Sequence, residues 1–465
     1  MKKGGKNLRD NTFVLEETIN ALLESKKYST LRDVLSTMNA ADVAILFEEI
    51  PEDKLPLLFR LLPKELAAET FVEMDTDNQE LLIRGFSDNE LKEVVDELYV
   101  DDAADIVEEM PANVVKRILK QADPETRKMI NEILNYPEDS AGSIMTTEYV
   151  SLRPKMTAEE AIKRIRRTGV DKETIYTCYV TQDDRTLIGY LSIKTLILSE
   201  EDDRIEDIMD SNIIAVRTTD DQEDVARMFS KYNFMALPVV DKEDRLVGIV
   251  TVDDAIDVLT EETTEDIEKM AAITPSEKPY LKTSVIETWK ARMPWLLLLM
   301  ISATFTGLII TKFETALAAQ VALMSFVPML MDTAGNSGSQ ASVTVIRGIA
   351  LQEIGFVDFF KVVLKEARVS LICGATLAVV CFGKIMLVDH LLMHNPAVTA
   401  MVAFTVAVTL VLTIVCAKLV GCMLPMLAER LKLDPAVMAS PFITTIVDAV
   451  SLLIYFKVAT ALLGL

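Results

Sequence analysis

The chain has 465 residues and a formal net charge of −24 at pH 7, with 71 acidic against 47 basic residues. This length exceeds what one hydrophobic core holds, so we expect two or more domains. The excess acid lies before Lys290, whereas the last third is strongly apolar. The composition predicts an acidic water-soluble part followed by a membrane part. It excludes nucleic acid as a partner and favours cations.

The first residues, MKKGGKNLRDNTF, are basic but have no apolar run behind them, so we expect no signal peptide and a cytosolic acidic part. The five cysteines show neither paired nor metal-ligand spacing. Neither disulfides nor a thiolate site is therefore expected.

Residues 16–134 have a helical pattern, with short apolar stripes that are broken by proline and by acidic residues. Three segments are loosely self-similar: AADVAILFEEIP from Ala40, PKELAAETFVEMD from Pro63 and DDAADIVEEMP from Asp101. Repeated short helix pairs stack on one another, so we expect an all-α superhelical domain over residues 1–137. By themselves, Asp101, Asp102 and Asp105 are explained as N-terminal caps that compensate the helix dipole.

Residues 138–259 contain a clearer repeat, and each copy is expected to form strand, helix, strand, turn, strand and helix. The first copy contains SIMTTEYVSLRPKMTAEEAIKRIRR and TIYTCYVTQDDRTLIGYLSIKTLI, and the second contains DIMDSNIIAVRTTDDQEDVARMFSKY and FMALPVVDKEDRLVGIVTVDDAI. The repeat resembles a tandem pair of CBS domains, an α/β fold that often binds adenine nucleotides. We expect these domains at residues 138–200 and 201–260.

The resemblance implies a nucleotide site in the second copy. There Gly248, Thr251 and Asp254, in GIVTVDD, keep the ribose-binding pattern of CBS domains. The first copy reads GYLSIKT and has Thr195 where that acid would stand. ATP is thus the expected regulatory ligand of the second copy, and a purely structural CBS pair is the alternative.

An acidic linker (plug) helix is expected over residues 261–288. Acids that begin at the end of the second copy recur at steps of three and four residues: Asp254, Asp257, Glu261, Glu265 and Glu268. A helix carries residues at such steps on one face, where like charges destabilise it by a few tenths of a kcal/mol each. A hard divalent cation with oxygen ligands would neutralise them, and a solvated acidic face is the alternative.

The segment TWKARMPW, with Trp289 and Trp295 around basic residues, is typical of an interfacial anchor and opens a transmembrane domain over residues 289–465. Five spans are expected, each long enough to cross a bilayer: 294–311, 315–345, 365–388, 397–423 and 435–465. If the chain crosses the membrane five times, the basic loops all lie on the same side of the membrane. The positive-inside rule makes that side the cytosol, and the C-terminus then lies outside.

The second span is interrupted by an island of small and polar residues, PMLMDTAGNSGSQ. If this island is helical, steps of four residues align Asp332, Asn336 and Gln340, and Gly335 and Gly338 lie three residues apart. Glycines expose carbonyl groups and let another helix approach closely. A bilayer tolerates such residues only against protein or water, so the island predicts the wall of a pathway.

The fifth span contains Asp448, with Thr444 one turn before it and Asp434 fourteen residues before it. On one ideal helix the two acids would lie roughly 21 Å apart along the axis. They would project within about 40° of each other, one at the cytosolic mouth and one in mid-span. Pro441 is expected to disturb this register. An acid at such depth marks an ion or proton route, and a helix-to-helix hydrogen bond is the alternative.

The class of ion follows from the ligands. The pathway offers carboxylate, amide, hydroxyl and carbonyl oxygens, while His390 and His394 fall in an expected external loop. Oxygen ligands favour hard cations such as Mg²⁺ over zinc or copper. Because carboxylates are few and Mg²⁺ dehydrates reluctantly, we expect a largely hydrated ion.

The whole combination resembles the MgtE-type magnesium channels over nearly the full chain. The resemblance implies a homodimer with the pore between subunits, lined by the second and fifth spans. It makes Asp448 the pore carboxylate that holds hydrated Mg²⁺ and Asp434 the acid at the mouth. It also implies cytosolic Mg²⁺-sensing residues, which would be Asp101, Asp105, Asp221, Glu223, Asp254, Asp257, Glu262, Glu265 and Asp266.

Three positions depart from the family pattern. Asn233 stands where related sequences have a sensing acid, Ala334 replaces the first glycine of the usual GGN, and Ser440 precedes the proline where asparagine can occur. We expect these departures to change affinity or pore detail and to leave the class of protein unchanged.

The expected function is Mg²⁺ import across the cytoplasmic membrane by a channel or transporter, not an enzyme, that closes when Mg²⁺ binds its acidic cytosolic part. A membrane-anchored nucleotide receptor is one alternative, although it leaves mid-span Asp448 without a purpose. A broader Mn²⁺ or Co²⁺ transporter is another. A CBS-regulated anion carrier is disfavoured because the pathway is acidic.

Overall fold

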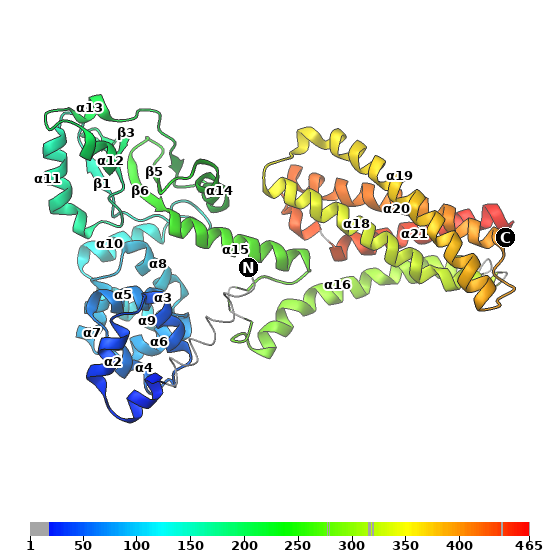
Figure 1. Ribbon diagram of the computed structural model, residues 1–465, viewed down its shortest axis with the longest axis horizontal. Coiled ribbons are helices and arrows are strands. Elements are labelled where there is room, and N and C mark those ends of the chain that lie inside the picture. Colours follow the sequence, from blue (N-terminus) through cyan, green and yellow to red (C-terminus); the bar gives the residue numbers. More distant parts are fainter. Residues whose placement is uncertain are drawn as a thin grey trace. The chain divides into compact units, whose positions relative to one another are not determined.

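The computed structural model describes residues 18–276, 278, 280–314, 318, 320–438 and 440–464 (Figure 1). The chain divides into two compact units, Met1–Leu259 and Thr260–Leu465. The first unit holds the short helices and the two repeats, and the second holds the long apolar helices.

The first unit opens with short helices of five to ten residues: α2 (Tyr28–Leu35), α3 (Ala40–Glu48), α4 (Leu55–Phe59), α5 (Lys64–Val72), α6 (Thr76–Gly85), α7 (Asp88–Val95), α8 (Val100–Glu109), α9 (Ala112–Gln121) and α10 (Pro124–Ile133). Capping side chains fix the starts of three of the listed helices, α6, α7 and α10. Ser87 and Glu90 form a capping box on α7, and Asp123 caps α10.

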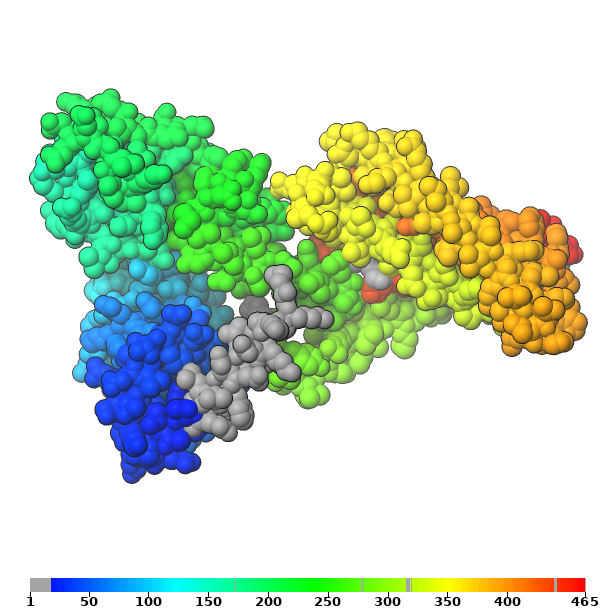
Figure 2. All heavy atoms as spheres, viewed as in Figure 1, coloured from blue at the N-terminus to red at the C-terminus, as the bar shows by residue number. Residues whose placement is uncertain are grey.

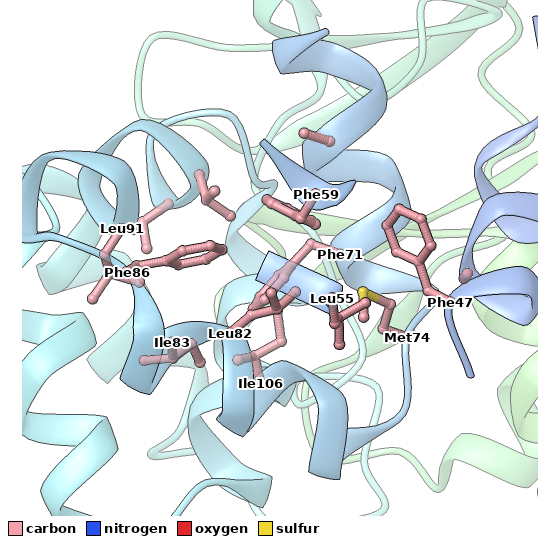
Figure 3. Close-up of a cluster of buried hydrophobic side chains, with 14 of the residues drawn as sticks. Phe47, Leu55, Phe59, Phe71, Met74, Leu82, Ile83, Phe86, Leu91 and Ile106 are labelled. Atoms are coloured by element: carbon pink, nitrogen blue, oxygen red, sulfur yellow. The ribbon is translucent and has the colours of Figure 1, made fainter. Parts of the chain in front are cut away.

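These helices stack in a row, with α3 against α5, α5 against α7 and α7 against α9. Their apolar stripes meet in one core, in which Phe59, Phe71 and Phe86 lie within aromatic contact of one another (Figure 3). Each helix is too short to be stable alone, so packing along the row stabilises the domain. The predicted all-α domain of stacked short helices is confirmed.

Two three-stranded sheets follow. The first copy contains β1 (Val150–Leu152), α11 (Ala158–Thr168), η1 (Gly169–Asp171), β2 (Thr177–Thr181), β3 (Leu187–Ser192) and α12 (Ile193–Leu198). The second contains α13 (Ile205–Ile208), β4 (Val216–Arg217), α14 (Gln222–Tyr232), β5 (Ala236–Val240) and β6 (Leu246–Thr251). In each sheet the first strand pairs parallel to the second, and the second pairs antiparallel to the third. The predicted order of strands and helices is confirmed in both copies.

The two repeats are interlocked by their leading segments. A Cβ atom on Gly248 of the second copy would clash with Met145 from the start of the first, and one on Gly189 would clash with Met209 in the same way. The Thr146 amide also donates to the carbonyl of Ile249. Each sheet is therefore completed by the other copy. Figure 2 shows the repeats, in cyan to green, adjoining the blue N-terminal helices.

The expected acidic helix over 261–288 begins and ends earlier than predicted. The helix α15 (Val252–Met270) follows β6 directly and continues through the acidic stretch. The next helix, α16 (Val285–Lys312), begins with a capping box formed by Ser284 and Glu287. Asp254 and Glu265 therefore belong to one continuous helix.

The second unit holds long helices and their short flanking turns: α16, η2 (Val321–Phe326), α18 (Val327–Ala350), η3 (Phe356–Asp358), α19 (Phe359–Lys384), η4 (Ile385–Leu392, a π-helix), α20 (Ala400–Arg430), η5 (Pro435–Met438) and α21 (Ser440–Leu463). In the described residues four runs are long and apolar enough to span a membrane: 285–312, 356–392, 400–430 and 435–463. α18 is a fifth long helix of 24 residues whose polar island makes it less apolar.

Two details of the expected spans are corrected. The island does not interrupt a helix, because α18 is helical throughout; it starts at Val327 rather than near residue 315, and residues 315–317 and 319 lie outside the described part. Asp434 precedes η5 and lies outside α21, so the expected 40° relation to Asp448 on one helix is wrong. Pro441 lies in the first turn of α21, where proline is tolerated and causes no kink.

The centre of the second unit is α20, which contacts α18, α19 and α21. The approach of α18 to α20 is close enough that a Cβ atom on Gly421 would overlap the carbonyl group of Gly338. Small residues allow such contacts between helices in a membrane. This packing fixes which face of α18 is turned inward and which remains open.

Candidate functional site

The polar side chains of α18 share its open face. Asp332, Asn336 and Gln340 are all exposed within the second unit, and the Asn336 amide donates to Asp332 Oδ1 over 3.2 Å. They form a strip of oxygen and nitrogen atoms along a helix of membrane-spanning length, as the sequence predicted. We call these three residues the polar strip.

The glycines do not belong to this strip. Gly335 and Gly338 are buried on the opposite face, where a Cβ atom on Gly335 would stand 3.0 Å from Thr444 Cγ2 of α21. Ala334 is fully buried there too. The group of residues that helical spacing predicted is thus divided in the structure: glycines set the spacing between helices, and the polar strip lines the open face.

Asp448 lies on α21, one turn after Thr444, and is half-buried. Its Oδ1 atom is buried and has no hydrogen-bond partner among the described residues. Asp332 is close enough for its carboxylate to repel that of Asp448. A buried carboxylate that lacks a donor and faces a second acid is costly unless a cation or a proton reaches it. Asp448 and Asp332 together therefore fit a cation pathway.

Asp434 is placed by two contacts at the start of η5. Its Oδ1 atom accepts a hydrogen bond of 2.8 Å from the Ala436 amide, and its Oδ2 atom lies 2.7 Å from Nζ of Lys269. The same Lys269 nitrogen lies 2.6 Å from a Glu265 oxygen. Burial lowers the pKa of Lys269, but its two carboxylate partners outweigh this and raise that pKa above its ordinary value. The ammonium group therefore joins the acidic helix to the expected mouth of the pathway.

A second acidic site lies in the first unit, where α8, the loop before β2 and the start of α15 meet. It contains Asp101, Asp102, Glu173 and Asp254, which we call the acidic cluster. Asp101 is 6% exposed, and its Oδ1 atom has no hydrogen-bond partner in the described part of the chain. The Glu173 Oε2 atom is also buried and has no hydrogen-bond partner among the described residues. A buried carboxylate oxygen without a donor would be stabilised by a cation or a proton.

The pKa values of the acidic cluster report the same crowding. Burial, and then repulsion by Asp254, raise the pKa of Asp101 well above its ordinary value, that of Asp102 to about 7 and that of Glu173 to about 8. Burial raises the pKa of Asp254 to about 6 against hydrogen bonds from Thr251 that lower it. The negative charge of the cluster is thus destabilised by burial and by mutual repulsion, and a bound cation would offset both effects.

The chemistry of these ligands fits Mg²⁺ through its hydration shell. Within the described residues, no three histidine, cysteine or acidic side chains lie close enough to bind one metal ion directly. Mg²⁺ keeps several waters and binds through one or two carboxylates, so it can bridge acids that do not touch. Asp105, one turn after Asp101, is exposed at the edge of the cluster. Even so, desolvation of its carboxyl group, and then repulsion by Asp254, raise the pKa of Asp105 to about 7, as for the members of the cluster.

Among the remaining expected sensing residues, Asp221 and Glu223 have local partners. Asp221 caps α14 through the Glu223 amide over 2.9 Å, and the Glu223 side chain pairs with Arg227. Asp257 is exposed on α15, while Glu262 and Asp266 are half-buried on the same helix. Their part in sensing Mg²⁺ stays a prediction.

The residues that are expected to bind a nucleotide make structural contacts within the protein. The Thr251 amide and hydroxyl both donate to Asp254 Oδ2 at the start of α15, and Gly248 is required by its contact with Met145. Packing alone therefore accounts for this pattern, and nucleotide binding there stays a prediction. Asn233, the departure in SKYNF, ends α14 in the left-handed conformation with φ 55°, which asparagine tolerates better than most residues.

Sequence reasoning missed Glu173 and Lys269. Glu173 lies in a loop without a pattern, so nothing in the sequence connects it with Asp101. Lys269 follows Glu265 by four residues, a spacing that signals an ion pair on a helix, but its contact with Asp434 depends on tertiary structure.

Comparison with known proteins agrees with this arrangement. The chain matches the family models of the MgtE intracellular N domain at residues 17–139, the CBS domain at 141–201 and 205–261, and a divalent cation transporter, MgtE, at 327–458. The magnesium transporter MgtE of Thermus thermophilus is 38% identical over 97% of this chain and 98% of the relative. That of Bacillus subtilis is 34% identical over 95% of each.

Among solved structures, the first unit is similar to the cytosolic domain of the Mg²⁺ channel MgtE in complex with ATP, with 38% identity and a TM-score of 0.50 over 52% of this chain and 99% of the other. A cytosolic-type unit with a CBS pair, joined to long apolar helices that carry a polar strip, defines a multidomain membrane transport protein. The chain belongs to the MgtE family of divalent cation transporters.

Proposed function

We propose that this protein carries Mg²⁺ across the cytoplasmic membrane and closes when Mg²⁺ occupies its acidic cluster. One observation carries the proposal: Asp448 lies in an apolar helix and has a buried carboxylate oxygen that accepts no hydrogen bond from the described residues. The Asp332 carboxylate is close enough to repel it. Relatives named magnesium transporters cover nearly the whole chain, which supports Mg²⁺ as the cation.

The pathway is formed by two copies of the chain. The polar strip, Asp332, Asn336 and Gln340, is exposed in a single copy, and a bilayer does not tolerate such side chains against lipid. A second copy that covers this face would enclose the strips and both Asp448 side chains around one axis. This homodimer accounts for the exposed polar side chains without placing them in lipid.

The ion passes with most of its water. The polar strip and Thr444 offer amide, hydroxyl and carboxylate groups, and these suit a hydrated hard cation better than direct coordination, which needs about six close oxygens. Asp448 supplies charge attraction at mid-span, while the amide groups of the strip supply hydrogen bonds to the bound waters.

Closure follows from neutralisation of the acidic cluster. Without a cation, Asp101, Asp102, Glu173 and Asp254 repel one another and loosen the contact of α8 with the start of α15. Hydrated Mg²⁺ would bridge them and hold α15 in place. The same helix carries Glu265 and Lys269 toward Asp434, so occupancy of the cluster is transmitted along a single continuous helix.

The first unit faces the cytosol and the C-terminus lies outside. This orientation is supported by the basic residues that flank the spans and by the similarity to a structure described as a cytosolic domain. That structure holds ATP, which supports ATP as a regulatory ligand of the CBS pair in this chain.

The test is Mg²⁺ uptake into liposomes that contain the purified full-length protein, at low and high internal Mg²⁺. We expect Asp448→Asn to reduce uptake by about tenfold or more, because the mid-span charge is lost. The matched control is Asp389→Asn, which removes a carboxylate of η4 that pairs with Lys384 at the end of α19. This variant should conduct normally. Uptake by Asp448→Asn at the control rate would refute the pathway.

Gating is tested with Asp101→Asn and Asp254→Asn in the same assay. We expect both variants to respond less to internal Mg²⁺ while still conducting. Unchanged inhibition in both variants would show that the acidic cluster is not the sensor, and it would leave the pathway assignment intact.

A further inference from the structure

The first CBS copy contains a pocket of about 380 Å³ on the side of β1 and α11. Its walls come from the segment around β1, from one face of α11 and from the region where β2 turns into β3. The lining residues are Thr147, Tyr149, Val150, Ser151, Arg153, Arg164, Thr168, Lys172, Thr181 and Arg185.

The pocket is basic within an acidic part of the chain. Arg153, Arg164, Lys172 and Arg185 line it, and no acidic side chain is among the described lining residues. The remaining polar side chains of the lining carry hydroxyl groups, which can donate hydrogen bonds: Thr147, Tyr149, Ser151, Thr168 and Thr181. Four like charges around one small space repel each other, so the arrangement needs a reason beyond packing.

Two of the cations are held in position by neutral acceptors. Arg153 donates to the Thr181 carbonyl over 3.0 Å and to its hydroxyl over 2.7 Å, and Arg185 donates to the Tyr149 hydroxyl over 3.3 Å. The nearest acid to Arg153 is Asp183, at 4.0 Å and fully exposed, which is a weak partner. These hydrogen bonds fix the guanidinium groups without neutralising them.

The other two cations have no anionic partner in the part of the chain that the structure describes. Arg164 and Lys172 are half-buried, and within the described residues their charged groups make no hydrogen bond or ion pair. Side chains of this kind usually reach into water or pair with an acid. Here they line a pocket that already contains two oriented guanidinium groups.

We propose that this pocket binds the phosphate group of a small phosphorylated ligand. Guanidinium groups match phosphate oxygens with paired hydrogen bonds, and an ammonium group adds charge. The volume lies within the range of small-molecule sites. The ligand is either a free phosphate anion or the phosphate end of a nucleotide, and both have the same chemistry toward these residues.

This site is separate from the residues discussed above. Gly248, Thr251 and Asp254 of the second copy do not line it, and its charge is opposite to that of the acidic cluster. A neighbouring pocket of about 350 Å³ shares Thr147, Tyr149 and Arg185 and continues to α10 of the helical domain. A ligand longer than one phosphate could therefore extend from the first CBS copy toward that domain.

The experiment measures binding by isothermal titration of the full-length protein in detergent with EDTA present. The probes are pyrophosphate, AMP and ATP. We expect Arg164→Gln with Lys172→Gln to weaken binding by about tenfold or more, because charge-assisted hydrogen bonds are lost. Arg166→Gln with Arg167→Gln is the matched control, since it removes two exposed charges from the same helix. The control should change binding by less than about threefold, the scale of a screened surface charge.

The outcomes separate the two sources of phosphate. Equal affinity for pyrophosphate and ATP indicates a free phosphate anion, and tighter binding of ATP or AMP indicates a nucleotide. Absence of binding by all three probes, or an equal loss in both double variants, overturns the site. If the first double variant misfolds, Lys172→Gln alone decides, with thermal unfolding as the check on its fold. None of these outcomes depends on Mg²⁺ transport.

Discussion

Lys269 Nζ lies 2.7 Å from Asp434 Oδ2 and 2.6 Å from a Glu265 oxygen, so one ammonium group bridges two carboxylates. Lys269 lies at the end of α15, and Asp434 begins the segment that leads into α21. All three side chains are only partly exposed, which strengthens the interaction relative to a surface pair. The Lys269 ammonium group therefore lies between α15 and Asp434, the acid that is expected at the mouth of the pathway.

Replacement of Lys269 by methionine should make closure more dependent on Mg²⁺. Glu265 and Asp434 would then repel each other and only a bound ion could bridge them. We expect higher uptake at low internal Mg²⁺, and a half-inhibitory Mg²⁺ concentration raised by about threefold to tenfold, the scale of one partly buried ion pair. Liposome flux at graded internal Mg²⁺ measures both. Lys361→Met, which removes an exposed pair with Asp358, should leave both values unchanged.

The acidic cluster should make the first unit less stable as pH rises when divalent cations are absent. The pKa values of Asp102 and Glu173 are about 7 and 8, above those of unfolded carboxyl groups near 4. The folded state thus binds more protons between these limits, so its stability falls as pH rises from about 4 to 8. In EDTA we expect the midpoint of thermal unfolding to be several degrees higher at pH 6 than at pH 8.

Mg²⁺ should remove most of this pH dependence, with its largest stabilising effect at pH 8, where the carboxyl groups are charged. Asp102→Asn should flatten the pH profile in EDTA. Asp183→Asn, at a fully exposed carboxyl in the β2–β3 turn, should leave the profile as it is. A profile that is equally steep in Asp102→Asn would show that other groups cause it.

Gly421→Ala should destabilise the second unit. The new methyl group would overlap the backbone carbonyl of Gly338, which cannot move aside as a side chain can. We expect a loss of about 1–3 kcal/mol or more, the usual cost of overpacking, and reduced Mg²⁺ flux as α18 shifts away from α20. Gly307→Ala and Gly383→Ala are matched controls, because a Cβ atom there meets nothing within 4 Å. Thermal unfolding in detergent compares the three variants.

An ion pair inside the membrane helices provides a further test. Lys418 of α20 lies 3.8 Å from Glu366 of α19, and their side chains are only 7% and 12% exposed. Removal of one partner leaves the other charge buried alone, so Lys418→Met or Glu366→Gln should each cost about 3–5 kcal/mol. The double variant Lys418→Met with Glu366→Gln should lose less than the sum of the two single losses. If the losses simply add, the two charges do not act as a pair.

Much of the fold could be read from the sequence. The short capped helices, the repeated strand and helix order of the CBS pair, and the long apolar helices all follow from local periodicity and capping, which depend on neighbouring residues. Ser87 with Glu90 and Thr157 with Glu160 are capping boxes that the structure shows where the sequence pattern allows them. The polar strip on α18 also followed from helical spacing once that segment was helical.

The sequence by itself determined the composition of each part, the order of its elements and the presence of a mid-span acid, because those properties depend on residue type and spacing. Tertiary structure alone decided which partners meet. Asp434 lies outside the helix that contains Asp448. Gly335 and Gly338 lie on the face of α18 opposite the polar strip, and Glu173 lies near Asp101. Such contacts join residues far apart in the chain, and only the packing of whole helices and sheets sets their distances.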